Sequence, residues 1–359
     1  FVELEFHTMG KRLFGDDFDA GPQQTLTFEA GDDLKTIADV KHDYELVDTP
    51  GKRKKLIGKL KKQKAFCFDT ETTGLNVKTC EVIGLAFSFQ AHTGFYVPLP
   101  EDRAGAKAIL EEFREVLEDP EIEKIGHHLK YDLGVLLWQG IRVQGKLFDT
   151  LLAAYVAAPE LKRNMDFLSQ ALLGYRPIKI SELIGEKEKG KEQKSMREVP
   201  LEQVVEYAAE DADITIQMAE ALRPKIKEQN QEKVFEEIEC PLVPVLVAME
   251  YEGIRMDVQA IQNLSVDLKH EIQSTQEKIY ELAGEKFNLN SSKQLGELLF
   301  GKMELDPNAR RTAKTGQYQT SEAILRRLAY KHEIVEQIMY YRMCSKLKST
   351  YVDMLPGTV

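Results

Sequence analysis

The sequence has little cysteine and no long apolar run. It holds four cysteines in 359 residues, and no two of them form a CxxC pair. That number and spacing exclude a disulfide scaffold and a cysteine-based zinc site, so a reducing, cytoplasmic setting is expected. No window approaches the ~20 apolar residues that a membrane helix requires, which excludes a membrane-spanning protein. No basic-then-apolar signal segment opens the chain.

The charge is unevenly distributed along the chain. The net charge is −11, which disfavours nucleic acid as a partner. Residues 240–359 hold 15 basic and 15 acidic residues, so residues 1–239 carry the whole excess. An acidic domain can still act on a polyanion when some of its carboxylates hold divalent metal. The remaining composition, 43% hydrophobic and 30% charged, is typical of two or three globular domains.

The spacing of apolar residues predicts an α/β layer fold for the first part of the chain. The expected strands are 65–68, 82–89, 94–99 and 122–126, and the expected helices are 104–118, 129–138, 148–157 and 165–173. Residues 1–63 are expected to be an irregular start, and the lysine-rich segment 177–200 is expected to be a loop.

Only helices are expected after residue 200. They are predicted at 201–239, 242–251, 258–282, 293–299, 321–330 and 333–347. A domain boundary is therefore placed near residue 240. The expected organisation is a connector and domain start in 1–63, an α/β domain in 64–239 and an all-α domain in 240–359.

Two carboxylates end the first expected strand. Asp69 and Glu71 are two residues apart, and residues at that spacing on a strand point to the same face. Like charges held so close are unfavourable unless a cation bridges them. The simpler interpretation is a solvated strand end before a turn.

A third acid, Asp132, lies just inside the helix expected after strand 122–126. An acid in the first helical turn is also favoured by the helix dipole, with no further function. His127 and His128 precede this helix. Adjacent side chains on an extended segment point in opposite directions, so at most one histidine faces a site.

A fourth acid follows a tyrosine on a later helix. Tyr207 and Asp211 are four residues apart and share one helix face. The small residues Ala208 and Ala209 between them allow another element to approach closely. Asp213 points well away from this face and is a weaker candidate. An ordinary amphipathic helix with a surface aspartate explains the same residues.

Together these residues form a more specific pattern than any of them alone. Four carboxylates can hold two hard divalent cations, which activate water and stabilise the leaving oxygen of a phosphodiester. The pattern resembles the proofreading 3′→5′ exonuclease domain of the bacterial DNA polymerase I family, family A. The segments that carry the resemblance are Phe68-Asp69-Thr70-Glu71-Thr72, Leu129-Lys130-Tyr131-Asp132 and Tyr207-Ala208-Ala209-Glu210-Asp211-Ala212-Asp213.

The resemblance implies a fold, a cofactor and roles for five residues. The fold is a ribonuclease-H-like mixed sheet flanked by helices. Asp69, Glu71, Asp132 and Asp211 are implied as ligands of two divalent ions, Mg²⁺ or Mn²⁺, and Tyr207 as the residue that positions water. The implied activity is hydrolysis of DNA from a 3′ end. No small-molecule cofactor and no membrane are implied, and a monomer is expected.

Further segments resemble other parts of the same family. The start of the chain resembles a connector, and the end resembles the beginning of the polymerase domain with its helical thumb. These segments are Phe1 to Phe6, Pro241 to Leu246, Gly253-Ile254, Phe287 to Leu295 and Lys346 to Tyr351. The palm and fingers are expected beyond Val359, so the chain is expected to be a fragment that cannot polymerise alone. The implied partners are a single-stranded DNA 3′ end and primer–template DNA.

Several exposed-type residues are candidates for DNA contacts. Leu75 is suited to wedge against the terminal base, and His128 stands where the family commonly has an asparagine near the terminal nucleotide. Lys162 and Arg163 are suited to a phosphate, although a solvated basic loop explains them equally. The candidates for the duplex backbone are Asn290, Ser291, Ser292, Lys293, Lys346 and Lys348. Helix capping by a serine, or simple surface exposure of a lysine, explains these residues without DNA.

Two other functions compete with an active exonuclease. One is a DNA-binding fragment with weak cleavage, which the histidine at position 128 leaves open. The other is a ribonuclease of the same acidic class. The thumb-like helical end disfavours the ribonuclease, and a preference for RNA would favour it.

Overall fold

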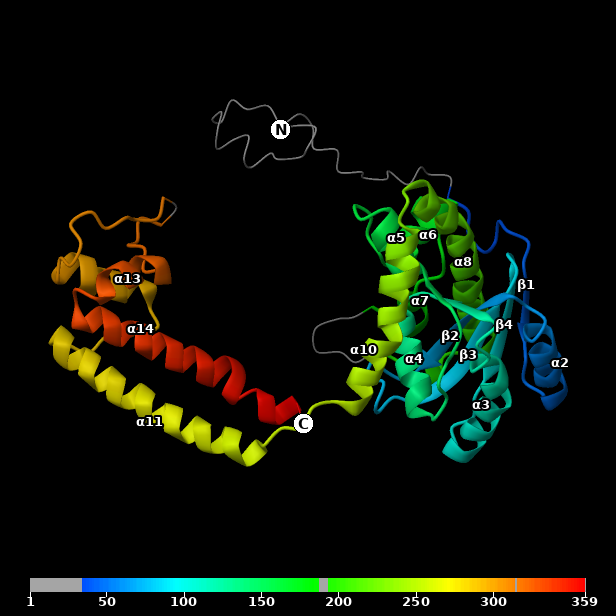
Figure 1. The fold of residues 1–359 in the computed structure, drawn as a ribbon, viewed down its shortest axis with the longest axis horizontal. Coiled ribbons are helices and arrows are strands. Elements are labelled where there is room, and N and C mark those ends of the chain that lie inside the picture. Colours follow the sequence, from blue (N-terminus) through cyan, green and yellow to red (C-terminus); the bar gives the residue numbers. More distant parts are fainter. Residues whose placement is uncertain (1–33, 187–192, 314, 359) are drawn as a thin grey trace, which may run out of the picture. The chain divides into compact units, whose positions relative to one another are not determined.

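The computed structural model describes residues 34–186, 193–313 and 315–358. Its compact units divide between Gly253 and Ile254, and we call them the sheet unit and the helical unit (Figure 1). The expected boundary near residue 240 therefore falls inside the sheet unit. Residues 1–33, which hold most of the expected connector, lie outside the described residues.

Six strands of the sheet unit form one mixed sheet in the order β1-β4-β3-β2-β5-β6. β2 lies antiparallel to β3 and parallel to β5, so it occupies the middle of the sheet. The bounds are β1 Asp43–Leu46, β2 Ala65–Thr72, β3 Val82–Ser88, β4 Thr93–Pro98, β5 Glu123–Gly126 and β6 Leu147–Asp149. The expected mixed sheet is confirmed.

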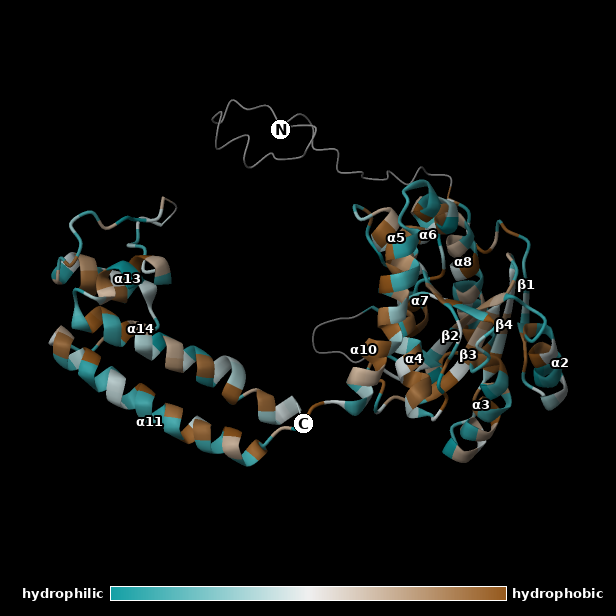
Figure 2. Cartoon of the chain, in the orientation of Figure 1, coloured by the Kyte–Doolittle hydropathy of each residue, from teal (hydrophilic) through white to brown (hydrophobic). Residues whose placement is uncertain are grey.

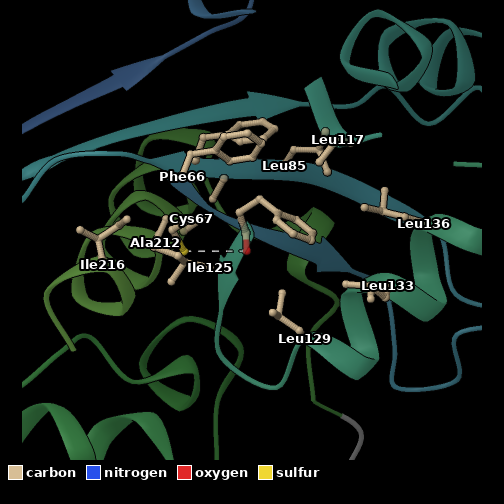
Figure 3. Packing of buried hydrophobic residues seen from close by; sticks show 14 of the residues in the cluster. Phe66, Cys67, Leu85, Leu117, Ile125, Leu129, Leu133, Leu136, Ala212 and Ile216 are labelled. Carbon is tan, nitrogen blue, oxygen red and sulfur yellow. Dashed lines mark hydrogen bonds between the residues drawn. The ribbon is translucent and has the colours of Figure 1, made fainter. Parts of the chain in front are cut away.

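Helices cover both faces of this sheet. α8 (Leu201–Glu228) contacts β1 to β5, and α3 (Arg103–Leu117) covers the opposite face beside α2 (Pro50–Leu60). Phe87 of β3 stacks on Phe113 of α3 with ring centroids 5.2 Å apart. Figure 3 shows Phe66 with Leu85 and Leu117, whereas Cys67 lies beside α8. The alternation of side chains along β2 thus builds two apolar layers around the sheet.

The remaining helices complete the sheet unit. They are α4 Leu129–Trp138, α5 Thr150–Ala157, α6 Met165–Leu173, α7 Ile180–Ile184, α9 Glu232–Val234 and α10 Cys240–Glu252, with the 3₁₀ helix η1 Met196–Glu198 and the π-helix η2 Phe235–Glu239. α10 packs on α4, which is why the unit extends to Gly253. No helix in the described ranges is long and apolar enough to cross a membrane.

Several elements differ from the expectations, including α7 and η1, which lie in the segment 177–200 that is expected to be a loop. The irregular start contains β1, and the helix expected at 148–157 begins as β6 and becomes helical only at Thr150. Both strands are short, so their backbone hydrogen bonds to β4 and β5 decide their conformation. The helix expected at 201–239 ends at Glu228, two residues before Asn230, which has a left-handed φ of 55°.

The helical unit is built from α11 and α14, which pack along each other. Its elements are α11 Val258–Ala283, α12 Ser292–Gly296, η3 Glu297–Lys302, α13 Glu322–Ala329, α14 Glu333–Lys346, η4 Leu347–Val352 and η5 Leu355–Thr358. Its core includes the buried side chains of Ile279, Leu295, Leu325 and Val335. Figure 2 shows apolar and polar residues alternating along α11 and α14. A helical region after the α/β region is confirmed, and its one non-helical pairing among the described residues is the bridge between Arg311 and Tyr318.

Candidate active site

Strand β2 directs Asp69 and Glu71 to the face that α8 covers. Cys67, two residues earlier on the strand, lies beside Ala212 of α8 in Figure 3. Side chains two residues apart on a strand share a face, so both carboxylates point toward α8. Glu71 is buried, and Asp69 is partly buried.

Helix α8 brings Tyr207 and Asp211 to the same place. Gly94 of β4 permits this approach, because a Cβ atom there would lie 2.6 Å from the carbonyl oxygen of Ala209. The expected close packing over the small residues of this motif is confirmed. Burial, followed by the negative charges of Asp211, Glu71 and Asp69, raises the pKa of the Tyr207 hydroxyl above its ordinary value.

Asp132 reaches β2 along its open edge. β5 pairs with β2 only as far as Cys67, and the chain then turns into α4. Beyond Cys67, Asp132 of α4 provides the acceptor for β2 that a neighbouring strand would otherwise provide. Its Oδ1 accepts hydrogen bonds from Thr70 N at 3.0 Å and from Thr70 Oγ1 at 2.6 Å. Only 2% of Asp132 is exposed. One carboxylate oxygen is thus held by the strand, which fixes the side chain beside Asp69.

The four carboxylates form one electrostatic cluster. Burial raises the pKa of Asp69 to about 6. Burial, followed by repulsion from neighbouring carboxylates, raises the pKa values of Glu71, Asp132 and Asp211 well above the ordinary range. Within the described residues, none of the four forms an ion pair with a lysine, arginine or histidine. When they are ionised, the four carboxylates therefore have no basic side chain among the described residues to neutralise them.

This donor set suits divalent metal by its chemistry. Buried carboxylates that repel one another, without a basic neighbour, are the ligands that hard cations take in proteins. In the arrangement that the described residues adopt, no three His, Cys, Asp or Glu side chains are positioned as ligands of one ion. The site thus contains the right groups, although fewer than three of them are placed around any one position for an ion in this arrangement.

Two further acids of the same helix serve a different purpose. Glu210 is fully buried and accepts hydrogen bonds from the Tyr175 hydroxyl and, at 2.7 Å, from Ile178 N. Asp213 accepts from the Tyr44 hydroxyl at 2.8 Å and from His92 N at 2.7 Å. Sequence reasoning singled out neither as an anchor, because nothing in the motif marks which acid meets donors. These bonds fix the rotation of α8, and with it Asp211.

The two histidines before α4 differ in burial, and His128 does not continue the extended segment that the sequence predicts for them. His127 is partly buried, and its ring nitrogens lie 2.8 Å from Thr150 Oγ1 and 3.1 Å from Arg163 O. His128 is exposed and has the left-handed φ of 70°. Asparagine and histidine both tolerate that conformation better than most residues, which is a backbone reason for either at this position.

A tight turn carries Leu75. The Tyr131 hydroxyl of α4 donates to Gly74 O at 2.7 Å and lies 2.5 Å from Thr72 Oγ1. Leu75 itself is 92% exposed. A large apolar side chain held out by an anchored turn is suited to meet a base. Leu75 remains a candidate contact.

The other basic candidates of the sheet unit lie in the loop before α6. Lys162 and Arg163 are exposed, and the Arg163 guanidinium lies 4.5 Å from the ring centroid of Tyr155. The cation–π contact orients Arg163 but leaves its hydrogen-bond donors available.

The candidates in the helical unit divide into two groups. Ser291 caps α12, since its hydroxyl accepts from Gln294 N at 3.3 Å, and Lys348 Nζ donates to Asp353 Oδ1 and to Ser265 Oγ, both at 2.7 Å. These two side chains therefore have structural partners. The exposed candidates are Asn290, Ser292, Lys293 and Lys346. Asn290 and Ser292 line a groove of about 590 Å³ with Arg342.

Comparison with known proteins assigns the chain to a family. The sequence profile of a 3′-5′ exonuclease family matches residues 44–227, and that of DNA polymerase family A matches residues 258–359. The chain belongs to the DNA polymerase I-like proteins of family A, with a 3′-5′ exonuclease domain and part of a polymerase domain.

Individual relatives agree with this assignment. The chain is 36% identical to DNA polymerase I of Pseudomonas aeruginosa over 92% of its own length and 37% of the relative. It is 35% identical to DNA polymerase I of Bacillus subtilis over 98% of its length and 36% of the relative. The chain thus spans about a third of the length of these relatives.

A solved structure shares the fold. The POL domain of Pol1 from M. smegmatis, in complex with DNA primer-template and dNTP, superposes with a TM-score of 0.68 at 23% identity. The match covers 86% of this chain and 49% of that chain.

Proposed function

We propose that the sheet unit hydrolyses DNA from a 3′ end by a two-metal mechanism and so removes misincorporated nucleotides. The observation that carries the proposal is the buried cluster of Asp69, Glu71, Asp132 and Asp211 with Tyr207. The cluster comes from three distant segments of a chain that belongs to an exonuclease family.

Each residue of the cluster has a role in the proposed reaction. Asp69, Glu71 and Asp211 would hold Mg²⁺ or Mn²⁺, and Asp132, held by Thr70, would act on the same ions through water. Bound divalent ions supply an activated water and stabilise the departing 3′-oxygen. The Tyr207 hydroxyl, beside Asp211, orients the water for attack on the terminal phosphorus.

The surroundings of the cluster suit a single strand. Leu75 offers an apolar surface to the terminal base. Lys162 and Arg163 offer cations to the phosphates, and the exposed His128, directly before α4, is a candidate contact of the terminal nucleotide. We also infer that the helical unit contacts primer–template DNA through the exposed residues around Asn290. The whole protein would act in DNA replication and repair as a DNA polymerase.

The cysteines indicate the cellular compartment in which the protein acts. All four cysteines are free, and three of them are buried. Free thiols are typical of reducing compartments, so we infer that the protein acts in the bacterial cytosol.

The test is degradation of 5′-labelled single-stranded DNA in the presence of Mg²⁺ or Mn²⁺. We expect a ladder of products shortened from the 3′ end, abolished by chelator and by Asp69→Ala/Glu71→Ala. Glu206→Ala, which removes an exposed acid from α8, is the matched control and should leave cleavage unchanged.

Other outcomes would replace the proposal. A folded protein that binds primed duplex but cleaves no DNA would be a DNA-binding fragment. Faster cleavage of an RNA strand of the same sequence would instead indicate a ribonuclease that reads the 2′-OH.

A further inference from the structure

A second concave site lies in the sheet unit, outside the carboxylate cluster. It is a pocket of about 490 Å³ between the loop that enters β3, the start of α3, the end of α4 and η1. None of Asp69, Glu71, Asp132 and Asp211 lines it. The pocket is therefore separate from the carboxylate cluster, and the proposed exonuclease reaction gives it no role.

The pocket is positively charged within an acidic part of the chain. Its basic lining residues are Lys78, Arg103, Lys107 and Arg197, and its acidic ones are Glu81 and Glu101. Glu81 lies 3.9 Å from Arg103 and 3.5 Å from Arg197, so it serves both arginines. Among the described residues, Lys78 and Lys107 form no ion pair. An excess of positive charge in a concavity attracts an anion.

Arg197 adds an unmet hydrogen-bond donor. Its side chain is only 18% exposed, and its Nε is a buried nitrogen without a hydrogen-bond partner in the described residues. Its other contact, to Leu99 O, is long at 3.4 Å. Because Nε has almost no accessible surface, a ligand in the pocket would reach the guanidinium through its terminal nitrogens, whose contacts to Leu99 O and Glu81 are long.

An aromatic surface completes the pocket. Trp138, the single tryptophan of the chain, lines it at the end of α4. Lys78 Nζ lies 5.7 Å from the Trp138 ring centroid, and Tyr251 packs against the ring at 4.7 Å between centroids. A cation beside an indole suits a ligand that joins a phosphate to a planar base.

We propose that this pocket binds a nucleotide, with its phosphate held by Lys78, Lys107 and Arg197 and its base against Trp138. The volume is too large for phosphate alone and is within the range of small-molecule sites. The nucleotide is either free nucleoside monophosphate or one unit of a bound single strand, since both present the same chemistry.

The test measures binding to the full chain by titration calorimetry with chelator present, so that metal-dependent binding at the carboxylates is suppressed. The probes are deoxyadenosine monophosphate, deoxyadenosine, inorganic phosphate and a short oligothymidylate. Lys78→Ala/Lys107→Ala is the test variant. Lys225→Ala/Lys227→Ala, which removes two exposed lysines at the far end of α8, is the matched control.

We expect the test variant to weaken binding of the monophosphate about tenfold or more and the control to leave it unchanged. Trp138→Phe should weaken binding of the monophosphate while leaving that of inorganic phosphate alone. If only the oligothymidylate loses affinity, the phosphate belongs to a bound strand.

Two results would overturn the proposal. One is equal affinity of both double-lysine variants for every probe, and the other is no binding of any probe at millimolar concentration. Neither result bears on the exonuclease, because cleavage is measured with metal and through Asp69 and Glu71.

Discussion

The sheet unit and the helical unit hold their candidate residues in opposite ways. In the sheet unit the acidic candidates Glu71, Asp132 and Asp211 are buried, and none of them has a basic partner among the described residues. In the helical unit the candidates are exposed or, like Ser291, already bonded to the fold. A buried charge without a partner lowers stability and needs a functional reason, whereas an exposed polar residue needs none. Motif residues are therefore more informative in the sheet unit.

The largest effect should come from removing one carboxylate of the buried cluster. Asp211→Asn keeps the shape but loses a metal ligand, so we expect cleavage of single-stranded DNA to fall by about a thousandfold or more. The urea midpoint should stay the same or rise, because one repelling charge is gone. If Asp211→Asn were less stable but fully active, Asp211 would be a structural residue. The buried acids of the sheet unit would then be no more informative about function than the exposed residues of the helical unit.

Tyr207→Phe should have the next largest effect. It removes only the hydroxyl that orients water, so we expect the turnover number to fall about a hundredfold with DNA affinity unchanged. Single-turnover cleavage beside equilibrium binding of the same oligonucleotide separates the two quantities. Loss of affinity at unchanged turnover would place Tyr207 in substrate binding.

Glu210→Gln tests the anchors of α8. The glutamine amide has a single acceptor oxygen, which can serve Ile178 N only if the NH₂ group donates to the Tyr175 hydroxyl in place of the bond that Glu210 now accepts, so we expect the free energy of unfolding to fall by about 1 kcal/mol. Because the rotation of α8 positions Asp211, cleavage by the folded protein should fall as well. Glu206→Gln, at an exposed position of the same helix, is the control and should change neither stability nor cleavage. Unchanged cleavage by Glu210→Gln would show that Glu210 stabilises the fold without positioning Asp211.

A pair of serines tests the helical unit. Ser291→Ala removes the cap of α12 and should lower the stability of this unit by about 1 kcal/mol without changing primer–template affinity. Ser292→Ala should leave stability unchanged and weaken duplex binding a few-fold. Chemical denaturation measures the stability, and fluorescence anisotropy measures the affinity for duplex DNA. If Ser291→Ala weakened DNA binding and Ser292→Ala lowered stability, the two roles would be the other way round.

The smallest effect concerns a buried charge away from the active site. Burial lowers the pKa of Lys124 to about 8, so the folded state holds fewer protons than the unfolded state between about pH 8 and the ordinary lysine pKa of about 10.4. Stability should therefore gain about 1 kcal/mol from this group as the pH rises from 7 to 9. Lys124→Met should lack that gain, and equal pH slopes in the two proteins would show that Lys124 is solvated.

Most of the long elements could be predicted from the sequence, and so could the central group of the site. Phe66 to Phe68 and the run from Val82 lie in the two middle strands of the sheet, as expected. Short apolar runs without polar alternation are typical of strands whose two faces are both covered by helices. The spacing of Asp69 and Glu71, and that of Tyr207 and Asp211, was sufficient to place each pair on one face.

The tertiary structure alone decided the remaining features. β1 and β6 are strands because β4 and β5 supply their hydrogen bonds, and α10 joins the sheet unit because it packs on α4. Asp211 and its neighbours Glu210 and Asp213 are alike in sequence, yet Glu210 and Asp213 accept hydrogen bonds from the backbone of other segments, whereas Asp211 lies among Asp69, Glu71 and Tyr207. Local spacing sets the direction of a side chain, but what it meets there depends on segments far away in the chain.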